Sequence, residues 1–222
     1  MAGHKYSIIM AANSLHELFR QRKLWKGSRE GEADAERGIG TGFPSLDKIL
    51  PYCGWPRGAV MEVAVSDWGI GELSLFLPLM SHCHRHGRYV VWVAPPHTPY
   101  PPALASNGLN LDLCRVLSNS CFGKEVNRQI PWCAENLLHN RACGLVLAWP
   151  RTLSGGAVRR LQLAAEGSES LCILWREANR KHGWDGGLAT MRLRLIREAR
   201  GLKLEIVKAR GTCRYTETVL DI

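Results

Sequence analysis

The segment Val65–Leu75, V-S-D-W-G-I-G-E-L-S-L, has the setting of a phosphate-binding loop but lacks its reactive side chains. It follows an apolar run and precedes a helix-like run, as such loops do. A working loop supplies a lysine to the phosphates and a hydroxyl to Mg²⁺. The two glycines and the residues at these two positions are, in order, Gly69, Gly71, Glu72 and Leu73. Because a carboxylate repels phosphate and leucine offers no oxygen, we expect a degenerate site and no cofactor.

Cationic and aromatic side chains are mixed in the segment Trp175–Leu188, W-R-E-A-N-R-K-H-G-W-D-G-G-L. Cations neutralise phosphates and an indole stacks on an unpaired base, so this mixture is typical of single-stranded DNA binding. The candidate DNA-binding residues here are Arg176, Arg180, Lys181, His182 and Trp184. The open alternative is a solvated loop whose Trp184 packs back on the domain.

A second basic group follows the apolar run 145–149 and comprises Arg151, Arg159 and Arg160. If that run is a strand of a parallel sheet, Arg151 lies at the carboxyl edge, where ligands bind in open α/β sheets. We therefore expect this group to assist DNA binding. The alternative is that its glycine pair, Gly155-Gly156, only permits the turn into a helix.

Three histidines and a cysteine lie close together, at His82, Cys83, His84 and His86. On a helix, His82 and His86 share a face, as a pair of metal ligands would. The helix is expected to end near Gly87, however, and imidazoles there favour the negative end of the helix dipole. Since no second pair of ligands is nearby, we expect no metal site.

The net charge of +9 is concentrated in the last third of the chain, where residues 151–222 carry 14 basic and 8 acidic side chains. This favours a polyanion or an acidic protein as partner, with a solvated basic surface as the alternative. No apolar run reaches the ~18 residues of a membrane span, so no membrane association is expected. The first residues make a poor secretion signal. The eight cysteines are spread singly, which indicates reduced thiols and a cytoplasmic location.

The chain is expected to have two parts. Residues 1–37 contain an amphipathic helix, Ser14–Trp25, followed by a polar linker, and residues 38–222 form a compact domain. The apolar side chains of this helix are candidates for docking on a partner protein, and they are Leu15, Leu18, Phe19 and Trp25. The alternative is a helix folded back on its own domain, because a helix this short needs a surface to lie on.

Within residues 38–222, apolar runs alternate with helix-patterned ones. Strands are predicted at 59–65, 89–94, 113–117, 145–149 and 171–175. Helices are predicted at 72–86, with a kink at Pro78, and at 101–107, 125–140 and 156–166. Continuous apolar strands separated by helices indicate an α/β fold, with a mostly parallel sheet covered on both faces. Alternating runs at 189–196, 202–208 and 212–220 predict additional C-terminal antiparallel strands.

The stretch Ile39–Val63, I-G-T-G-F-P-S-L-D-K-I-L-P-Y-C-G-W-P-R-G-A-V-M-E-V, resembles the opening of the RecA recombinase core. That core begins with a T-G-x-x-x-L-D segment, a G-G-x-P-x-G turn and a V-E-I strand. The resemblance extends in order to Arg210, through Leu104–Leu117, Gly186–Leu188 and Val207–Arg210. It implies a RecA-like core in which the two basic segments occupy the places of RecA's DNA-binding loops.

The chain departs from RecA at each group that ATP hydrolysis needs. Besides the two loop positions, the acid of the fourth core strand is missing from Ala148-Trp149-Pro150. The catalytic glutamate is missing from Ala94-Pro95-Pro96. Phosphate clamp, metal ligand and base are thus lost together, which predicts a protein that is not an enzyme.

This combination is similar to the ImuA family of translesion-synthesis-associated proteins, which overlaps the SulA-type division inhibitors. The resemblance implies a non-catalytic accessory role in the mutagenic DNA synthesis of the damage-induced SOS response. The implied partners are the inactive Y-family polymerase homologue ImuB, RecA, an error-prone DnaE-type polymerase and single-stranded DNA. Two alternatives stay open: an inhibitor of the division GTPase FtsZ, and a DNA-dependent ATPase with an atypical phosphate loop.

Overall fold

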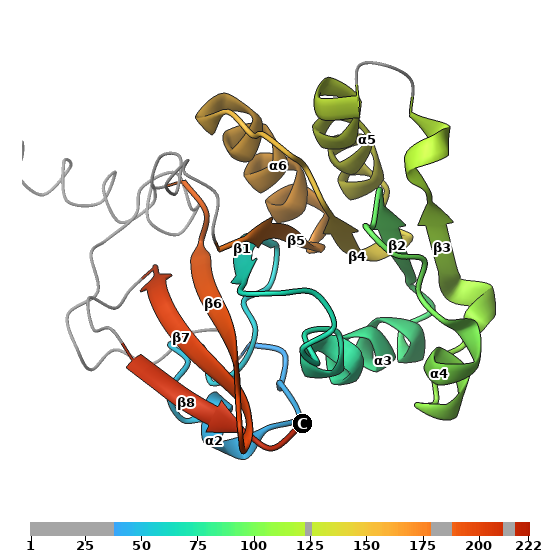
Figure 1. Ribbon diagram of the computed structural model, residues 1–222. Coiled ribbons are helices and arrows are strands. Elements are labelled where there is room, and N and C mark those ends of the chain that lie inside the picture. Colours follow the sequence, from blue (N-terminus) through green and yellow to red (C-terminus); the bar gives the residue numbers. More distant parts are fainter. Residues whose placement is uncertain (1–37, 123–125, 179–187, 211–215) are drawn as a thin grey trace, which may run out of the picture. The chain divides into compact units, whose positions relative to one another are not determined.

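The computed structural model describes residues 38–122, 126–178, 188–210 and 216–222. These residues form an α/β fold on one eight-stranded sheet, in the order β3-β2-β4-β5-β1-β6-β7-β8 (Figure 1). The strands are β1 (Ala59–Val65), β2 (Tyr89–Val93), β3 (Cys114–Leu117), β4 (Cys143–Ala148), β5 (Leu171–Glu177), β6 (Met191–Glu198), β7 (Gly201–Ala209) and β8 (Thr216–Leu220). The α-helices are α2 (Pro44–Asp47), α3 (Leu77–Arg85), α4 (Pro101–Ser106), α5 (Val126–His139) and α6 (Gly155–Ser168).

The parallel strands form where the sequence is continuously apolar. Every residue of β1 and of β4 is buried, as a strand covered on both faces requires. The five apolar runs predicted as strands are β1 to β5, with ends shifted by at most two residues. The predicted α/β architecture with a mostly parallel sheet is therefore confirmed.

The C-terminal strands extend the sheet beyond β1. β7 pairs antiparallel with both β6 and β8, as predicted. β6 itself, however, runs parallel to β1, with Met61 beside Met191. The alternating pattern of β6 arises because one face joins the core through Leu193 while the other carries Arg192 and Arg194.

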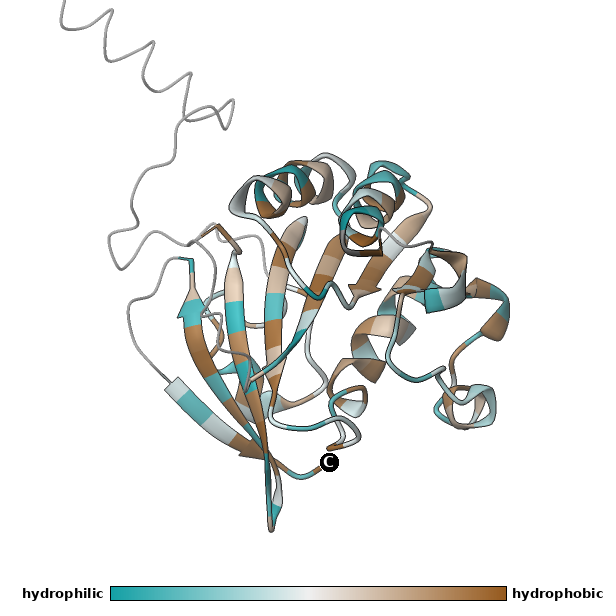
Figure 2. Cartoon of the chain, turned by 45° about the horizontal axis from the view of Figure 1, so that its top comes forward, coloured by the Kyte–Doolittle hydropathy of each residue, from teal (hydrophilic) through white to brown (hydrophobic). Residues whose placement is uncertain are grey.

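Helices cover both faces of the parallel strands (Figure 1). α5 and α6 pack side by side on one face, over a core that includes Val60 and Val146. α3 and α4 cover the other face, where Met61 and Leu147 lie. Figure 2 shows largely apolar strands between helices whose outer sides are polar. None of the helices in the described ranges has the length and apolar character that a membrane span needs.

The helix predicted from Glu72 begins later than expected. A 3₁₀ turn, Ser74–Phe76, follows the loop after β1, and α3 starts only at Leu77. Pro78 explains the difference, because proline lacks an N–H and its ring clashes with the carbonyl four residues earlier. Proline destabilises the interior of a helix but is favoured in its first turn, and α3 begins just before this proline. The predicted kink is therefore wrong, and Pro78 lies in the first turn of α3.

The connections after neighbouring strands leave the sheet in opposite directions. After β2 the chain passes to α4 and on to β3, whereas after its neighbour β4 it enters α6 on the other face and goes on to β5 (Figure 1). Ser154 begins α6, because its hydroxyl oxygen accepts a hydrogen bond from the Ala157 N–H at 3.3 Å. In open α/β sheets, ligands bind at the carboxyl edge where such connections diverge.

Candidate functional site

The loop after β1 is closed by its own glutamate. The Gly69 N–H donates a hydrogen bond to a carboxylate oxygen of Glu72 at 3.1 Å. Glu72 is only 8% exposed, so its carboxylate lies inside the turn. Gly69 and Gly71 have φ of 81° and 97°, values that favour glycine and allow the chain to fold around this side chain. The carboxylate thus accepts the hydrogen bond of an amide that a phosphate-binding loop would direct to its ligand.

Contacts from the C-terminal strands hold this loop from outside. Arg197 donates a hydrogen bond to the Ile70 carbonyl at 3.3 Å, and Ile70 is itself buried. The Ile222 side chain lies close enough to Gly71 that a Cβ there would meet it at 3.5 Å. Since α3 begins only at Leu77, the positive end of its dipole also lies beyond the loop. The Gly69 N–H and the Ile70 carbonyl of this loop thus have partners within the chain.

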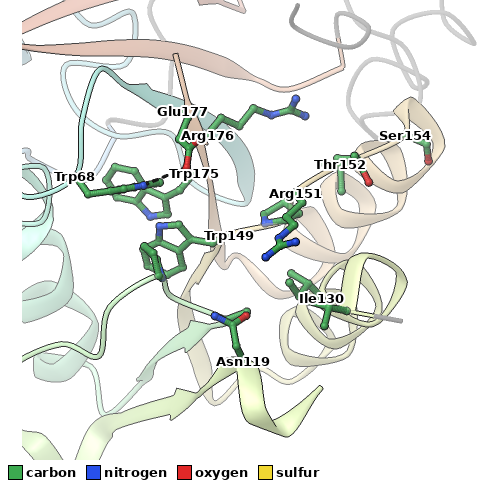
Figure 3. Close-up of a pocket in the computed structure, with 15 residues that line it drawn as sticks. Trp68, Asn119, Ile130, Trp149, Arg151, Thr152, Ser154, Trp175, Arg176 and Glu177 are labelled. Atoms are coloured by element: carbon green, nitrogen blue, oxygen red, sulfur yellow. Dashed lines mark hydrogen bonds between the residues drawn. The ribbon is translucent and has the colours of Figure 1, made fainter. Parts of the chain in front are cut away.

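A pocket of about 920 Å³ opens beside this loop, at the carboxyl ends of the parallel strands (Figure 3). Its wall includes residues that directly follow β1, β2 and β4, together with the last residues of β5. The labelled lining residues are Trp68, Asn119, Ile130, Trp149, Arg151, Thr152, Ser154, Trp175, Arg176 and Glu177. The pocket thus lies at the edge where the connections after β2 and β4 diverge, which is where open α/β sheets bind ligands.

Three tryptophans form one wall of the pocket. The Trp149 and Trp175 indoles stack with centroids 5.8 Å apart and planes 9° apart. Trp68 meets Trp175 edge-on, with ring centroids 6.4 Å apart. Phe76, a core residue, also meets Trp175 edge-on, with centroids 5.5 Å apart. Trp175 is 1% exposed, whereas Trp149 is half-buried. The inner indole is therefore fixed by packing, and the outer one borders the pocket.

Several buried donors at this edge have no hydrogen-bond acceptor within the described ranges. They are the indole nitrogens of Trp149 and Trp175 and two nitrogens of Arg176, Nε and one Nη. Trp68 differs, because its indole donates to the Glu177 carboxylate at 3.4 Å. An unpaired buried donor costs free energy, and its presence in a cavity is typical of a site that accepts a ligand or ordered water.

Arg176 takes part in a buried charge cluster. Glu62, in the middle of β1, is fully buried and accepts a hydrogen bond from Arg192 Nε at 2.8 Å. The Arg176 guanidinium lies 3.7 Å from the other oxygen of Glu62. A buried carboxylate needs such partners, because removing a charge from water is costly. Arg176, predicted to contact DNA phosphates, is therefore 16% exposed and directed to Glu62.

The predicted DNA-binding residues after β4 lie in two places. Arg151 is exposed and lines the pocket together with Arg176. Arg159 and Arg160 are exposed on α6, and Arg160 pairs with Glu135 of α5 at 3.0 Å. The structure thus brings Arg151 and Arg176 together at one site, while the α6 arginines point to solvent.

The other predicted site residues lie outside the described ranges. These are Arg180, Lys181, His182 and Trp184 of the basic segment, and Leu15, Leu18, Phe19 and Trp25 of the N-terminal segment. The DNA-contact and partner-docking predictions for them stay predictions.

The histidines at the end of α3 contact one another and nearby backbone groups. The His82 and His86 rings lie 4.4 Å apart, and a His86 ring nitrogen lies 2.8 Å from the His82 carbonyl. His84 Nδ1 accepts a hydrogen bond from the Asn110 N–H at 3.2 Å. Burial lowers the pKa of both His82 and His84. Among the described residues, no group of three or more potential ligands could hold a metal ion.

The cysteines in the described ranges are free thiols. Cys83, Cys143 and Cys172 are buried. Burial raises the pKa of Cys83 to about 11 and that of Cys143 to about 12. Both side chains therefore stay protonated at neutral pH and pack as small apolar groups rather than nucleophiles.

The sequence reasoning missed the tryptophan wall and the buried Glu62. In the sequence, Trp149 marks only the position of a missing acid, and Trp175 the end of a strand. One signal for Glu62 is present, because a single acid interrupts the apolar run A-V-M-E-V-A-V. Such a residue, buried on a central strand, requires cationic partners from neighbouring strands. No comparable signal indicates that the ends of β4 and β5 bring two indoles together.

Comparison with models of known protein families gives no match, and comparison with curated protein sequences gives none either.

Proposed function

We propose that this chain is a RecA-like accessory protein of damage-induced translesion DNA synthesis, which acts by binding and not by catalysis. The resemblance of the Ile39–Val63 stretch to the RecA core and the mostly parallel sheet with added antiparallel strands support the proposal. The chemistry of the degenerate site supports its non-catalytic part.

The observation that carries the proposal is the Glu72 carboxylate inside the loop after β1. It accepts the Gly69 N–H at 3.1 Å and lies buried within the turn. A triphosphate at the same place would meet a negative charge instead of a cation. The amide would also have to give up its present partner, so nucleotide binding is opposed by electrostatics and by geometry.

The two positions of missing acids give further support. Ala94 and Pro96 line the pocket after β2, and Trp149 lines it after β4. In a RecA-type ATPase, a catalytic base and a metal ligand come from these positions. Alanine, proline and tryptophan have no carboxylate and can act as neither. Glu177 also lines the pocket, but its carboxylate accepts the Trp68 indole N–H.

An accessory protein of this kind works through contacts with other molecules. The partners we propose are an ImuB-type inactive polymerase homologue, RecA, an error-prone DnaE-type polymerase and single-stranded DNA. The net charge of +6 over residues 151–222 suits the anionic member of this set. We propose that the protein works in the cytoplasm, where these partners act.

Deletion of the gene and complementation test the proposal in cells exposed to a DNA-damaging agent. We expect deletion to lower the frequency of damage-induced mutations, and the wild-type gene to restore it. Affinity purification of the tagged full chain from damaged cells should recover the ImuB-type protein or RecA. Filamentous cells on overproduction, with recovery of FtsZ and unchanged mutation frequency, would overturn the proposal in favour of a division inhibitor.

A further inference from the structure

We infer that the pocket at the carboxyl edge receives one unpaired base of single-stranded DNA, stacked on Trp149. The inference rests on the proposed function and names the ligand of this site. It differs from the loop contacts predicted from the sequence, because the stacking residue is Trp149 and not Trp184.

The arrangement of the indoles gives the first argument. One face of Trp149 is stacked on Trp175, so its other face is the one that can meet a ligand in the pocket. Trp175 is almost fully buried and is contacted edge-on by Phe76 and Trp68. The stack is therefore held in place before a ligand arrives, which lowers the entropic cost of binding. A base would continue the stack, and every base has a suitable face.

Hydrogen-bonding groups around the stack give the second argument. Base edges carry carbonyl and ring-nitrogen acceptors together with amino donors, which pair with neutral polar side chains. Asn119 and Thr152 add neutral polar groups to the wall, and the Asn119 amide is held by a hydrogen bond to the Pro95 carbonyl at 3.3 Å (Figure 3). These groups suit the edge of a planar heterocycle.

Charge gives the third argument and favours a nucleic acid strand over a peptide side chain. Arg151 is exposed where it borders the pocket, and Arg159 is exposed on α6, the helix that follows. A base in the pocket would remain joined to phosphates outside it, which such arginines neutralise. A free nucleoside triphosphate suits the site less well, because the neighbouring loop directs a carboxylate to its own amide.

Binding of fluorescent oligothymidylate, and of an abasic oligonucleotide of equal length, to the full chain tests the inference. Trp149→Ala should weaken oligothymidylate binding about tenfold, the usual effect of losing one base–aromatic stack. Binding of the abasic strand should not change, because it has no base to stack. Trp132→Ala is the matched control, since Trp132 is 66% exposed on α5 and does not line the pocket.

Trp149→Phe and Arg151→Ala keep the test informative if Trp149→Ala does not fold. Trp149→Phe should retain most of the affinity, because phenylalanine still stacks. Arg151→Ala should lower the slope of log affinity against log salt concentration by about one. The inference would be overturned if Trp149→Ala lost equal affinity for both oligonucleotides, if Trp132→Ala lost affinity, or if the wild-type chain bound no DNA. The accessory role is tested separately by mutation frequency and partner recovery.

Discussion

The two ends of the parallel strands differ in how their polar groups are paired. At the amino end, the Arg88 guanidinium donates five hydrogen bonds, at 2.8–3.1 Å. The acceptors are the carbonyls of Arg141, Cys143, Ser168 and Glu169 and the hydroxyl of Ser170. At the carboxyl end, buried nitrogens of Trp149, Trp175 and Arg176 have no acceptor in the described ranges.

This contrast assigns different roles to the two ends. Arg88 links the start of β2 to the start of β4 and to the end of α6, which stabilises the sheet. The carboxyl end keeps unpaired donors beside a pocket, at a cost in stability that a binding site explains. We therefore expect substitutions at the amino end to cost more stability than those at the carboxyl end, where we propose that a ligand binds.

Replacing the arginine at each end by methionine should give the largest difference in the free energy of unfolding. Arg88→Met should lower the free energy of unfolding by about 3 kcal/mol, because buried carbonyls lose charged donors. Arg176→Met should lower it by less, because Glu62 loses one nearby cation but still accepts a hydrogen bond from Arg192 at 2.8 Å. Urea denaturation of both variants measures this difference.

The contrast would fail if the two substitutions had equal effects on unfolding. It would be sharpened by Arg88→Lys, which keeps the charge but loses the planar fork of donors. We expect Arg88→Lys to recover only part of the loss of stability.

Removing the carboxylate of the closed loop should have a moderate effect. Glu72→Ala should cost about 1 kcal/mol of stability, because the Gly69 N–H loses its acceptor. It should not create affinity for Mg·ATP, since no lysine or hydroxyl replaces the lost group. Thermal unfolding with and without Mg·ATP measures both effects, and a ligand-induced increase in melting temperature in the variant alone would show that Glu72 was the only barrier.

The smallest expected effect is a pH dependence at the amino end. Burial holds the pKa of His82 and His84 below the ordinary value of 6.5, so the unfolded chain binds protons more readily than the folded one. Stability is therefore full above about 6.5 and declines as the pH falls through and below that value. His84→Gln should make this decline shallower in urea denaturation between neutral and mildly acidic pH. A steeper decline in the variant would mean that His84 is protonated more readily in the folded chain than in the unfolded one.

Comparison of sequence and structure shows which features are encoded locally. The strand Ala59–Val65 is predicted to the residue because a doubly covered strand must be continuously apolar. The start of α3 is missed because the effect of Pro78 extends back to the preceding turn. The tryptophan wall is missed for another reason. Trp149 and Trp175 end different strands, and their contact depends on β4 lying beside β5, which neither local pattern encodes.

Calorimetric titration of the full chain with Mg·ATP measures whether Glu72 closes the loop after β1 against nucleotides. We expect no saturable heat of binding at any Mg·ATP concentration at which the protein stays folded. Saturable one-to-one binding of Mg·ATP that ADP displaces would contradict it.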